Sequence, residues 1–183
     1  HIITCLVEGE FMQMEDVYRI DQGIERYMTK TQKKTADFME GCMELGGLLG
    51  GWSESEIVEL KKYGHALGMA FQITDDIMDY RETTETTGKP VGNDLREGLL
   101  TYPLLSIVND DNKDKLLADI KALNNGGDEQ AIINYVISQG GIDNTLAVAD
   151  QYCKDALAAL DAVRDFPGKE FLVMAVENLA DRK

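Results

Sequence analysis

The sequence contains little of what disulfide-rich, nucleic-acid-binding or membrane-spanning proteins need. Its three cysteines, Cys5, Cys42 and Cys153, are odd in number and far apart, which excludes a readable disulfide or zinc framework and favours a reducing, cytoplasmic setting. Basic residues are scarce, with 18 Lys and Arg against 33 Asp and Glu, so the net charge of −15 argues against a nucleic-acid partner. No apolar run reaches the length of a transmembrane helix.

Strand patterns are missing as well, and apolar residues recur at helical spacing along almost the whole chain. We therefore predict a single all-α domain over residues 1–183. Ser53 followed by Glu56 forms a capping-box pattern that predicts the start of a long helix. Residues 83–98, which include Gly88, Pro90 and Gly92, are expected to form a loop. Helices are expected at residues 2–14, 21–49, 53–80, 102–108, 113–123, 128–139, 144–164 and 168–183.

An acidic segment at the end of the long helix is the main candidate for chemistry. Asp75 and Asp79 lie one helical turn apart on the same face, with Asp76 beside them. Three carboxylates within about 6 Å repel one another, and the negative end of the helix dipole adds to the repulsion. A bound cation would relieve this, and ligands that are all oxygen favour Mg²⁺ over zinc. The alternative is an exposed acidic helix end with no ligand.

Two glycines continue the same helix face toward its N-terminus. Gly64 and Gly68 precede Gln72 at intervals of one turn. Glycine costs about 1 kcal/mol relative to Ala inside a helix. Their presence predicts that something lies close against this face, and that small side chains leave open the space that the aspartates face.

Two lysines offer positive charge for an anion. Lys89 lies between Gly88 and Pro90 in the loop that follows the aspartates. Lys34 precedes Thr35 in the second predicted helix, and a threonine hydroxyl that bonds to the preceding turn can bend a helix and direct both groups toward a cavity. Taken separately, these residues are better explained as a surface-loop lysine and an ordinary polar helix face.

Four segments together resemble motifs of the trans-polyprenyl diphosphate synthases. They are GEFMQ at residues 9–13, KTA at 34–36, GHALGMAFQITDDIMD at 64–79 and GKPVGNDLREGLLTYPLL at 88–105. The resemblance implies an isoprenoid-synthase-type helical bundle around a central cavity. In such a bundle Mg²⁺ holds the diphosphate of an allylic substrate, which condenses with isopentenyl diphosphate to give a polyprenyl diphosphate.

The resemblance also implies roles for individual residues. It assigns metal binding to Asp75, Asp76 and Asp79, either directly or through water. It assigns catalysis to Lys34, Thr35 and Gln72, and substrate binding to Lys34, Lys89, Phe71, Gln72 and Asp94.

The first aspartate-rich motif of the family, which lies upstream in its members, has no counterpart here. Asp110, Asp111 and Asp114 have a similar spacing, but they follow the second motif in a polar stretch and are interpreted as a solvated helix start. We therefore expect the N-terminal helices of the bundle to be missing and the chain to supply half of an active site. Apolar faces on the N-terminal helices predict a homodimer or a heterodimer.

Two alternatives stay open on the sequence alone. The first is a non-catalytic helical subunit that regulates a partner synthase, against which the retained Asp75, Asp76 and Asp79 count. The second is a terpenoid cyclase or squalene-type synthase, which shares the metal chemistry but lacks the aspartate-containing segment 64–79 and the segment 88–105 as they are written here.

Overall fold

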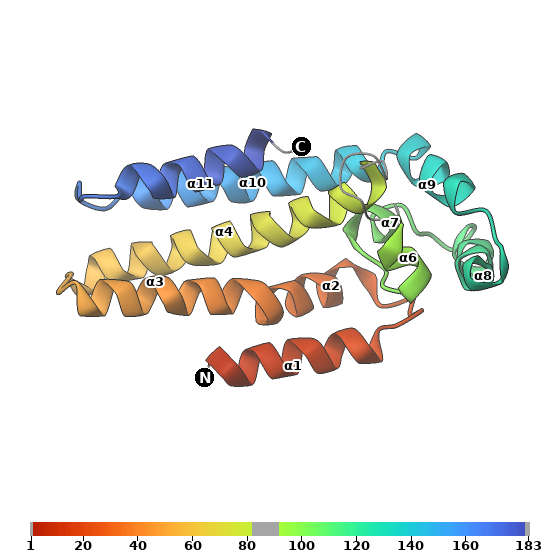
Figure 1. Ribbon diagram of the computed structural model, residues 1–183, viewed down its shortest axis with the longest axis horizontal. Helices are drawn as coiled ribbons and strands as arrows, with labels where there is room; N and C mark the ends of the chain where they lie inside the picture. Colours follow the sequence, from red (N-terminus) through yellow and green to blue (C-terminus); the bar gives the residue numbers. More distant parts are fainter. Residues whose placement is uncertain (1, 82–91, 182–183) are drawn as a thin grey trace.

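The structure is a computed structural model that describes residues 2–81 and 92–181. All regular elements in this part of the chain are helices, as the sequence predicts. The central helix, α4 (Glu54–Arg81), packs against α3 (Asp37–Leu49) and against α10 (Gly141–Asp161), and it runs between them in Figure 1. Helix α11 (Lys169–Asp181) packs on α10, and α1 (Ile2–Glu15) lies along the opposite side of the molecule.

The short helices gather at one end of the long ones, on the right in Figure 1. They are α6 (Asn93–Glu97), α7 (Tyr102–Leu105), α8 (Lys113–Ala122), η2 (Leu123–Asn125) and α9 (Glu129–Ser138). One apolar core joins this end to α4 through residues such as Ile73 and Ile77, and a second core around Tyr63 and Leu160 joins α4 to α10 and α11. Helix α4 therefore contributes to both cores, which holds its C-terminal acids in a fixed position.

The start of α4 follows the predicted capping box. The backbone N–H of Ser53 donates to Glu56 Oε2 at 3.1 Å, and the backbone N–H of Glu56 donates to Ser53 Oγ at 3.4 Å. These two bonds satisfy donors that the first turn of a helix leaves unpaired. The prediction of this helix is confirmed, with its end one residue beyond the expected position.

The predicted helix over residues 21–49 is helical without a break from Gly23 to Leu49, but it is not α-helical throughout. The structure has α2 (Gly23–Thr31), a π-helical segment η1 (Gln32–Ala36) and then α3. A π-helical turn carries an extra residue and commonly marks a functional position. The predicted mechanism of the bend is also wrong, because the Thr35 hydroxyl donates to Gln72 Oε1 on α4, at 3.2 Å, rather than to its own helix.

The predicted loop over residues 83–98 is wrong at its end, where residues 93–97 form α6. Gly92 and Gly98 bracket α6 with φ angles of 74° and 76°, in the left-handed region that glycine tolerates. The carboxylate of Asp79 accepts the backbone N–H groups of Asn93 and Asp94 at 3.0 and 3.2 Å. A side chain from α4 thus caps the short helix, which no local sequence signal indicates. Residues 83–91 of the predicted loop lie outside the described residues.

The other helices follow the predicted order with shifted ends. Helix α10 begins at Gly141 rather than Asn144 and ends at Asp161 rather than Arg164, and α7 ends at Leu105 rather than Val108. Among the described residues, no helix combines the length and apolar character that crossing a membrane requires.

The glycines of α4 allow other backbone segments to come into contact with the helix. A Cβ atom on Gly68 would lie 2.6 Å from Ala36 Cα, and one on Gly64 would lie 2.7 Å from the Met39 carbonyl oxygen. The predicted close approach is confirmed. The neighbour is the backbone of η1 and α3, however, so the prediction that these glycines leave free space in front of the aspartates is wrong.

Candidate active site

A polar cavity of about 260 Å³ lies where the C-terminal half of α4 meets α1, α2, η1 and the segment after α6. Five residues predicted for the site line it, namely Lys34, Gln72, Asp75, Asp76 and Asp94. The remaining lining residues are Gln13, Tyr27, Lys30, Thr31, Leu99 and Thr101. The cavity therefore brings together acids from one part of the chain and lysines from another.

The three acids of α4 have different environments. Asp75 is exposed and lines the cavity, whereas Asp76 is buried, with 4% of its surface accessible. Burial raises the pKa of Asp76 to about 6, although hydrogen bonds from Tyr27 and Gln72 oppose the rise. Asp79 is half-buried and caps α6. The three side chains have different neighbours. Among the described residues, they do not form a group whose ligand atoms all lie within 4.8 Å of one another, as those of Asp37, Glu40 and His65 do.

A chain of hydrogen bonds crosses the cavity wall and fixes the side chains near Asp76. The Thr35 hydroxyl donates to Gln72 Oε1 at 3.2 Å, and Gln72 Nε2 donates to Asp76 Oδ1 at 3.1 Å. The Tyr27 hydroxyl donates to the other oxygen of Asp76 at 2.5 Å. Both oxygens of Asp76 thus accept protein donors, and the orientation of the Gln72 amide follows from its two partners.

Replacing Tyr27 by Phe is expected to destabilise the protein by about 1–3 kcal/mol, because a buried carboxylate loses one of its two donors. The hydrogen bond favours the charged form of Asp76, so the loss should be larger near pH 8 than near pH 5. Urea unfolding at both pH values measures it. Tyr135→Phe is the matched control, since its hydroxyl makes an exposed contact with Asn112 at 3.4 Å. Equal losses for the two variants would contradict the prediction.

Of the acids that line the cavity, Asp94 has a more strongly raised pKa than Asp76. Its pKa is raised to about 7, first by burial and then by the charges of Asp79, Asp76 and Asp75. The pKa of Asp79 is raised too, by burial, against the bonds from the α6 backbone. Repulsion between these acids indicates that the described side chains leave the negative charge of this region uncompensated.

The raised pKa of Asp94 predicts a pH-dependent stability of the metal-free protein. The folded state binds this proton more tightly than the unfolded state, so the stabilisation is complete below the usual carboxyl range and is lost as the pH rises through about 7. Asp94→Asn should therefore raise the melting temperature at about pH 8 and leave it nearly unchanged at low pH. Thermal unfolding with and without a chelator tests this. Asp110→Asn is the control, because Lys113 lowers the pKa of Asp110. An Asp94→Asn variant whose melting temperature at about pH 8 equals that of the parent would refute the prediction.

Lys34 lies opposite the acids, on η1. Its ammonium forms an ion pair with Glu10 Oε1 at 3.1 Å and donates to Gln13 Oε1 at 3.0 Å. Both partners belong to the GEFMQ segment of α1, and Gly9 in that segment allows the approach, because a Cβ there would lie 2.7 Å from the Lys34 backbone nitrogen. Two of the segments singled out in the sequence are thus in direct contact.

Three predicted site residues that the structure describes, Thr35, Asp79 and Phe71, are not among the residues that line this cavity. Of these, Phe71 is 39% exposed on α4. Lys89 lies outside the described residues. The sequence reasoning in turn missed Tyr27, Lys30 and Thr31. A signal was present, because these three precede Lys34 by seven, four and three residues and therefore share its helix face.

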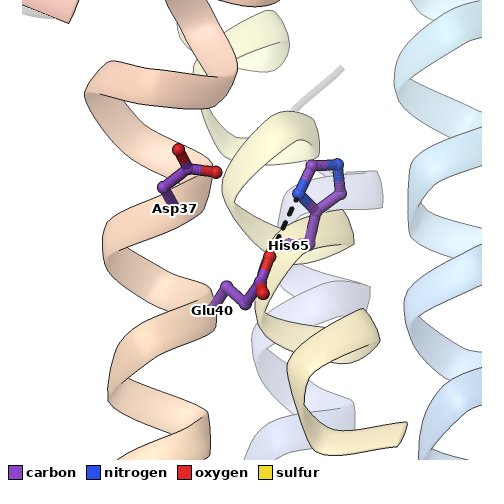
Figure 2. A group of neighbouring side chains, drawn as sticks. All are labelled: Asp37, Glu40 and His65. Carbon is purple, nitrogen blue, oxygen red and sulfur yellow. Dashed lines mark ion pairs between the residues drawn. The ribbon is translucent and has the colours of Figure 1, made fainter. Parts of the chain in front are cut away.

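A second polar group lies on the other half of α4, away from the cavity. Figure 2 shows Asp37 and Glu40 of α3 facing His65 of α4, with ligand atoms within 4.8 Å of one another. The Glu40 carboxylate already has two basic neighbours: its Oε2 lies 3.6 Å from His65 Nδ1, and its Oε1 lies 3.5 Å from Lys61 Nζ. This group was not predicted from the sequence. Its imidazole makes it a poorer match for Mg²⁺ than an all-oxygen set.

Comparisons with known proteins give the same result as the motifs. The model of the family described as polyprenyl synthetase matches residues 1–139. The chain belongs to this family. Over 161 residues it is 35% identical to heptaprenyl diphosphate synthase component 2 of Geobacillus stearothermophilus, covering 88% of this chain and 50% of that protein. It is 32% identical over 174 residues to octaprenyl diphosphate synthase of Escherichia coli, with 93% and 54% covered.

Solved structures of the polyprenyl synthetase family share the fold. Heptaprenyl diphosphate synthase from Staphylococcus aureus superimposes with a TM-score of 0.85 at 27% identity, over 98% of this chain and 57% of that one. A polyprenyl synthase from Caulobacter crescentus, in complex with calcium and isoprenyl diphosphate, gives 0.83 at 29% identity, over 100% and 57%. The predicted all-α, isoprenoid-synthase-type fold is confirmed. The chain spans about half the length of the relatives it matches.

Proposed function

We propose that this chain provides one wall of the active site of a Mg²⁺-dependent prenyltransferase. The reaction is condensation of isopentenyl diphosphate with an allylic diphosphate to give a polyprenyl diphosphate. The observation that carries the proposal is the cavity in which Asp75, Asp76 and Gln72 face Lys34. Membership of the polyprenyl synthetase family supports it, as does the Caulobacter relative that holds a divalent cation and a prenyl diphosphate.

The side chains of the cavity suit a hard divalent cation. Asp75 is exposed to the cavity and, among the described residues, accepts no hydrogen bond or ion pair, so its oxygens are available. Asp76 and Asp79 already accept protein donors, and we propose that they act on bound ions through water. Burial and then repulsion from neighbouring acids raise the pKa of Asp94, and a bound cation would relieve that repulsion. Bound Mg²⁺ would supply charge neutralisation for the departing diphosphate.

The protein residues have complementary roles in this proposal. The Lys34 ammonium balances negative charge that grows on the diphosphate as the allylic carbon–oxygen bond breaks. By the sequence resemblance, the oxygen atoms of Thr35 and Gln72 would lie near the cation that forms on the allylic carbon. The electron pair of the isopentenyl double bond then forms the new carbon–carbon bond, and the released diphosphate accepts the proton that is lost.

Further features of the proposal rest on the sequence resemblance. Lys89 and Asp94 would contact substrate, and Phe71 would line the prenyl chain. A homodimer or heterodimer, and a cytoplasmic location, stay predictions. The reading as a non-catalytic subunit is less favoured, because the acids and the lysine that catalysis needs lie together in one cavity.

Incorporation of radiolabelled isopentenyl diphosphate into extractable products tests the proposal. The complete protein is incubated with allylic diphosphates of increasing length, and we expect products only when Mg²⁺ and an allylic substrate are both present. Removing Mg²⁺ with a chelator should abolish incorporation, and restoring it should return the activity. Tight Mg²⁺-dependent binding of a diphosphate analogue without turnover would instead favour the regulatory subunit. No incorporation and no binding would refute both.

A further inference from the structure

Lys30, on α2, is a buried lysine that lines the cavity and that the sequence motifs do not mark. Only 7% of its surface is exposed. In the described part of the chain, no carboxylate lies within ion-pair distance of its ammonium group, and the contact that it makes is with the ring of Tyr27, 5.7 Å from the centroid. Removing a charge from water without an ionic partner costs free energy. If this position served only the fold, an apolar side chain of similar length would fill it without the desolvation free energy of a buried charge.

The charged groups around Lys30 also differ from those around the second lysine of the cavity. Burial is the main cause that lowers the pKa of Lys30; the charges of Asp16 and Asp76 oppose the fall, and those of Lys34 and Arg26 add to it. The other lysine of the cavity, Lys34, already pairs with Glu10 and donates to Gln13. Among the residues that the structure describes, the more deeply buried of these two ammonium groups therefore has no carboxylate within ion-pair distance.

The position of Lys30 indicates what the counter-ion is. It lies one helical turn before Lys34, so both side chains point to the same side of the helix. Across the cavity lie Gln72 and the acids of α4. Two cations on one wall and carboxylates on the other match an anion on the lysine side with divalent cations between it and the acids. Inorganic or ester diphosphate carries the negative charge that both cavity-lining lysines would balance.

We propose that Lys30 is a diphosphate-binding residue that acts beside Lys34 in this cavity. The inference rests on the proposed function, since it specifies which groups hold the diphosphate. It also gives Tyr27 a second role. The ring that contacts the Lys30 ammonium belongs to the same side chain whose hydroxyl holds Asp76, so Tyr27 connects the lysine wall to the acidic wall.

Calorimetric titration of inorganic diphosphate with Mg²⁺ into the complete protein tests the proposal. Lys30→Met should weaken binding by about tenfold or more, because a charge-assisted contact is lost. Lys30→Arg should restore affinity to within about threefold of the parent, because charge is retained. Lys33→Met is the matched control, since this neighbouring lysine pairs with Glu8 and does not line the cavity. Its affinity should equal that of the parent.

The outcomes separate the two levels of inference. A parent protein that turns over substrate, together with a folded Lys30→Met variant of parent-like affinity, overturns the role of Lys30 and leaves the proposed function standing. Equal weakening in the Met and Arg variants also overturns it, because a structural contact rather than charge would then be responsible. If Lys30→Met does not fold, Lys30→Gln replaces it under the same criteria. A parent that binds no diphosphate refutes both the Lys30 role and the proposed function.

Discussion

Asp75→Asn is expected to lower the Mg²⁺-dependent condensation rate of the complete protein about 1,000-fold. Asp75 is the acid of the motif whose carboxylate is exposed in the cavity and, among the described residues, is engaged by no other group. Asn keeps the shape of the side chain but loses the charge that attracts a divalent cation. Steady-state incorporation of radiolabelled isopentenyl diphosphate at saturating substrate measures the loss.

The matched control for Asp75→Asn is Asp110→Asn. Asp110 is 94% exposed in the second acidic cluster of similar spacing, where it pairs with Lys113. This variant should retain parent activity, because Asp110 is exposed and is not among the residues that line the cavity. Activity of Asp75→Asn within about tenfold of the parent would show that the exposed acid does not hold the catalytic cation. A melting temperature close to that of the parent would confirm that the effect is not a loss of fold.

Gly68→Ala is expected to destabilise the protein by about 1–3 kcal/mol, although alanine is the better helix former. The added Cβ would lie 2.6 Å from Ala36 Cα, so α4 and η1 must move apart. In a protein of this size such a loss lowers the melting temperature by about 3–10 °C. Because η1 carries Lys34 and Thr35, affinity for magnesium diphosphate should fall as well. Thermal unfolding and the diphosphate titration measure the two effects.

Gly46→Ala provides the control for the backbone contact. Gly46 is also inside a helix, but a Cβ atom there meets nothing within 4 Å. The same substitution should therefore stabilise the protein by about 0.5–1 kcal/mol through helix propensity alone. If both variants were stabilised, the close approach of α4 to η1 would not be a constraint on position 68.

Features of the fold that depend on interactions between residues close together in the chain could be predicted from the sequence. The helical class, the order of the helices and the capping box at Ser53 were predictable, because each depends on contacts within about four residues along the chain. The acidic segment and its neighbourhood with Lys34 were predictable from the motifs. The spacing of Lys30 and Lys34 places the two lysines on one helix face, but nothing in the sequence shows that the Lys30 side chain is buried.

The features that were mispredicted all depend on partners far away in the chain. The Tyr27 hydroxyl meets Asp76, 49 residues on, and Asp79 caps a helix that begins 14 residues later. Thr35 bonds to Gln72 rather than to its own helix, and the glycines of α4 accept backbone instead of opening a cavity. Helix periodicity does not predict such pairs, because they form only when separate helices pack against one another.

The amino-acid sequence alone determined that this protein is all-helical, that it belongs with the polyprenyl synthetases and that its acids and lysines are candidates for one site. Only the tertiary structure decided which acid is exposed to the cavity, which is buried under hydrogen bonds and which caps a neighbouring helix. The physical reason is that the charge state and availability of a carboxylate depend on burial and on donors that other helices supply.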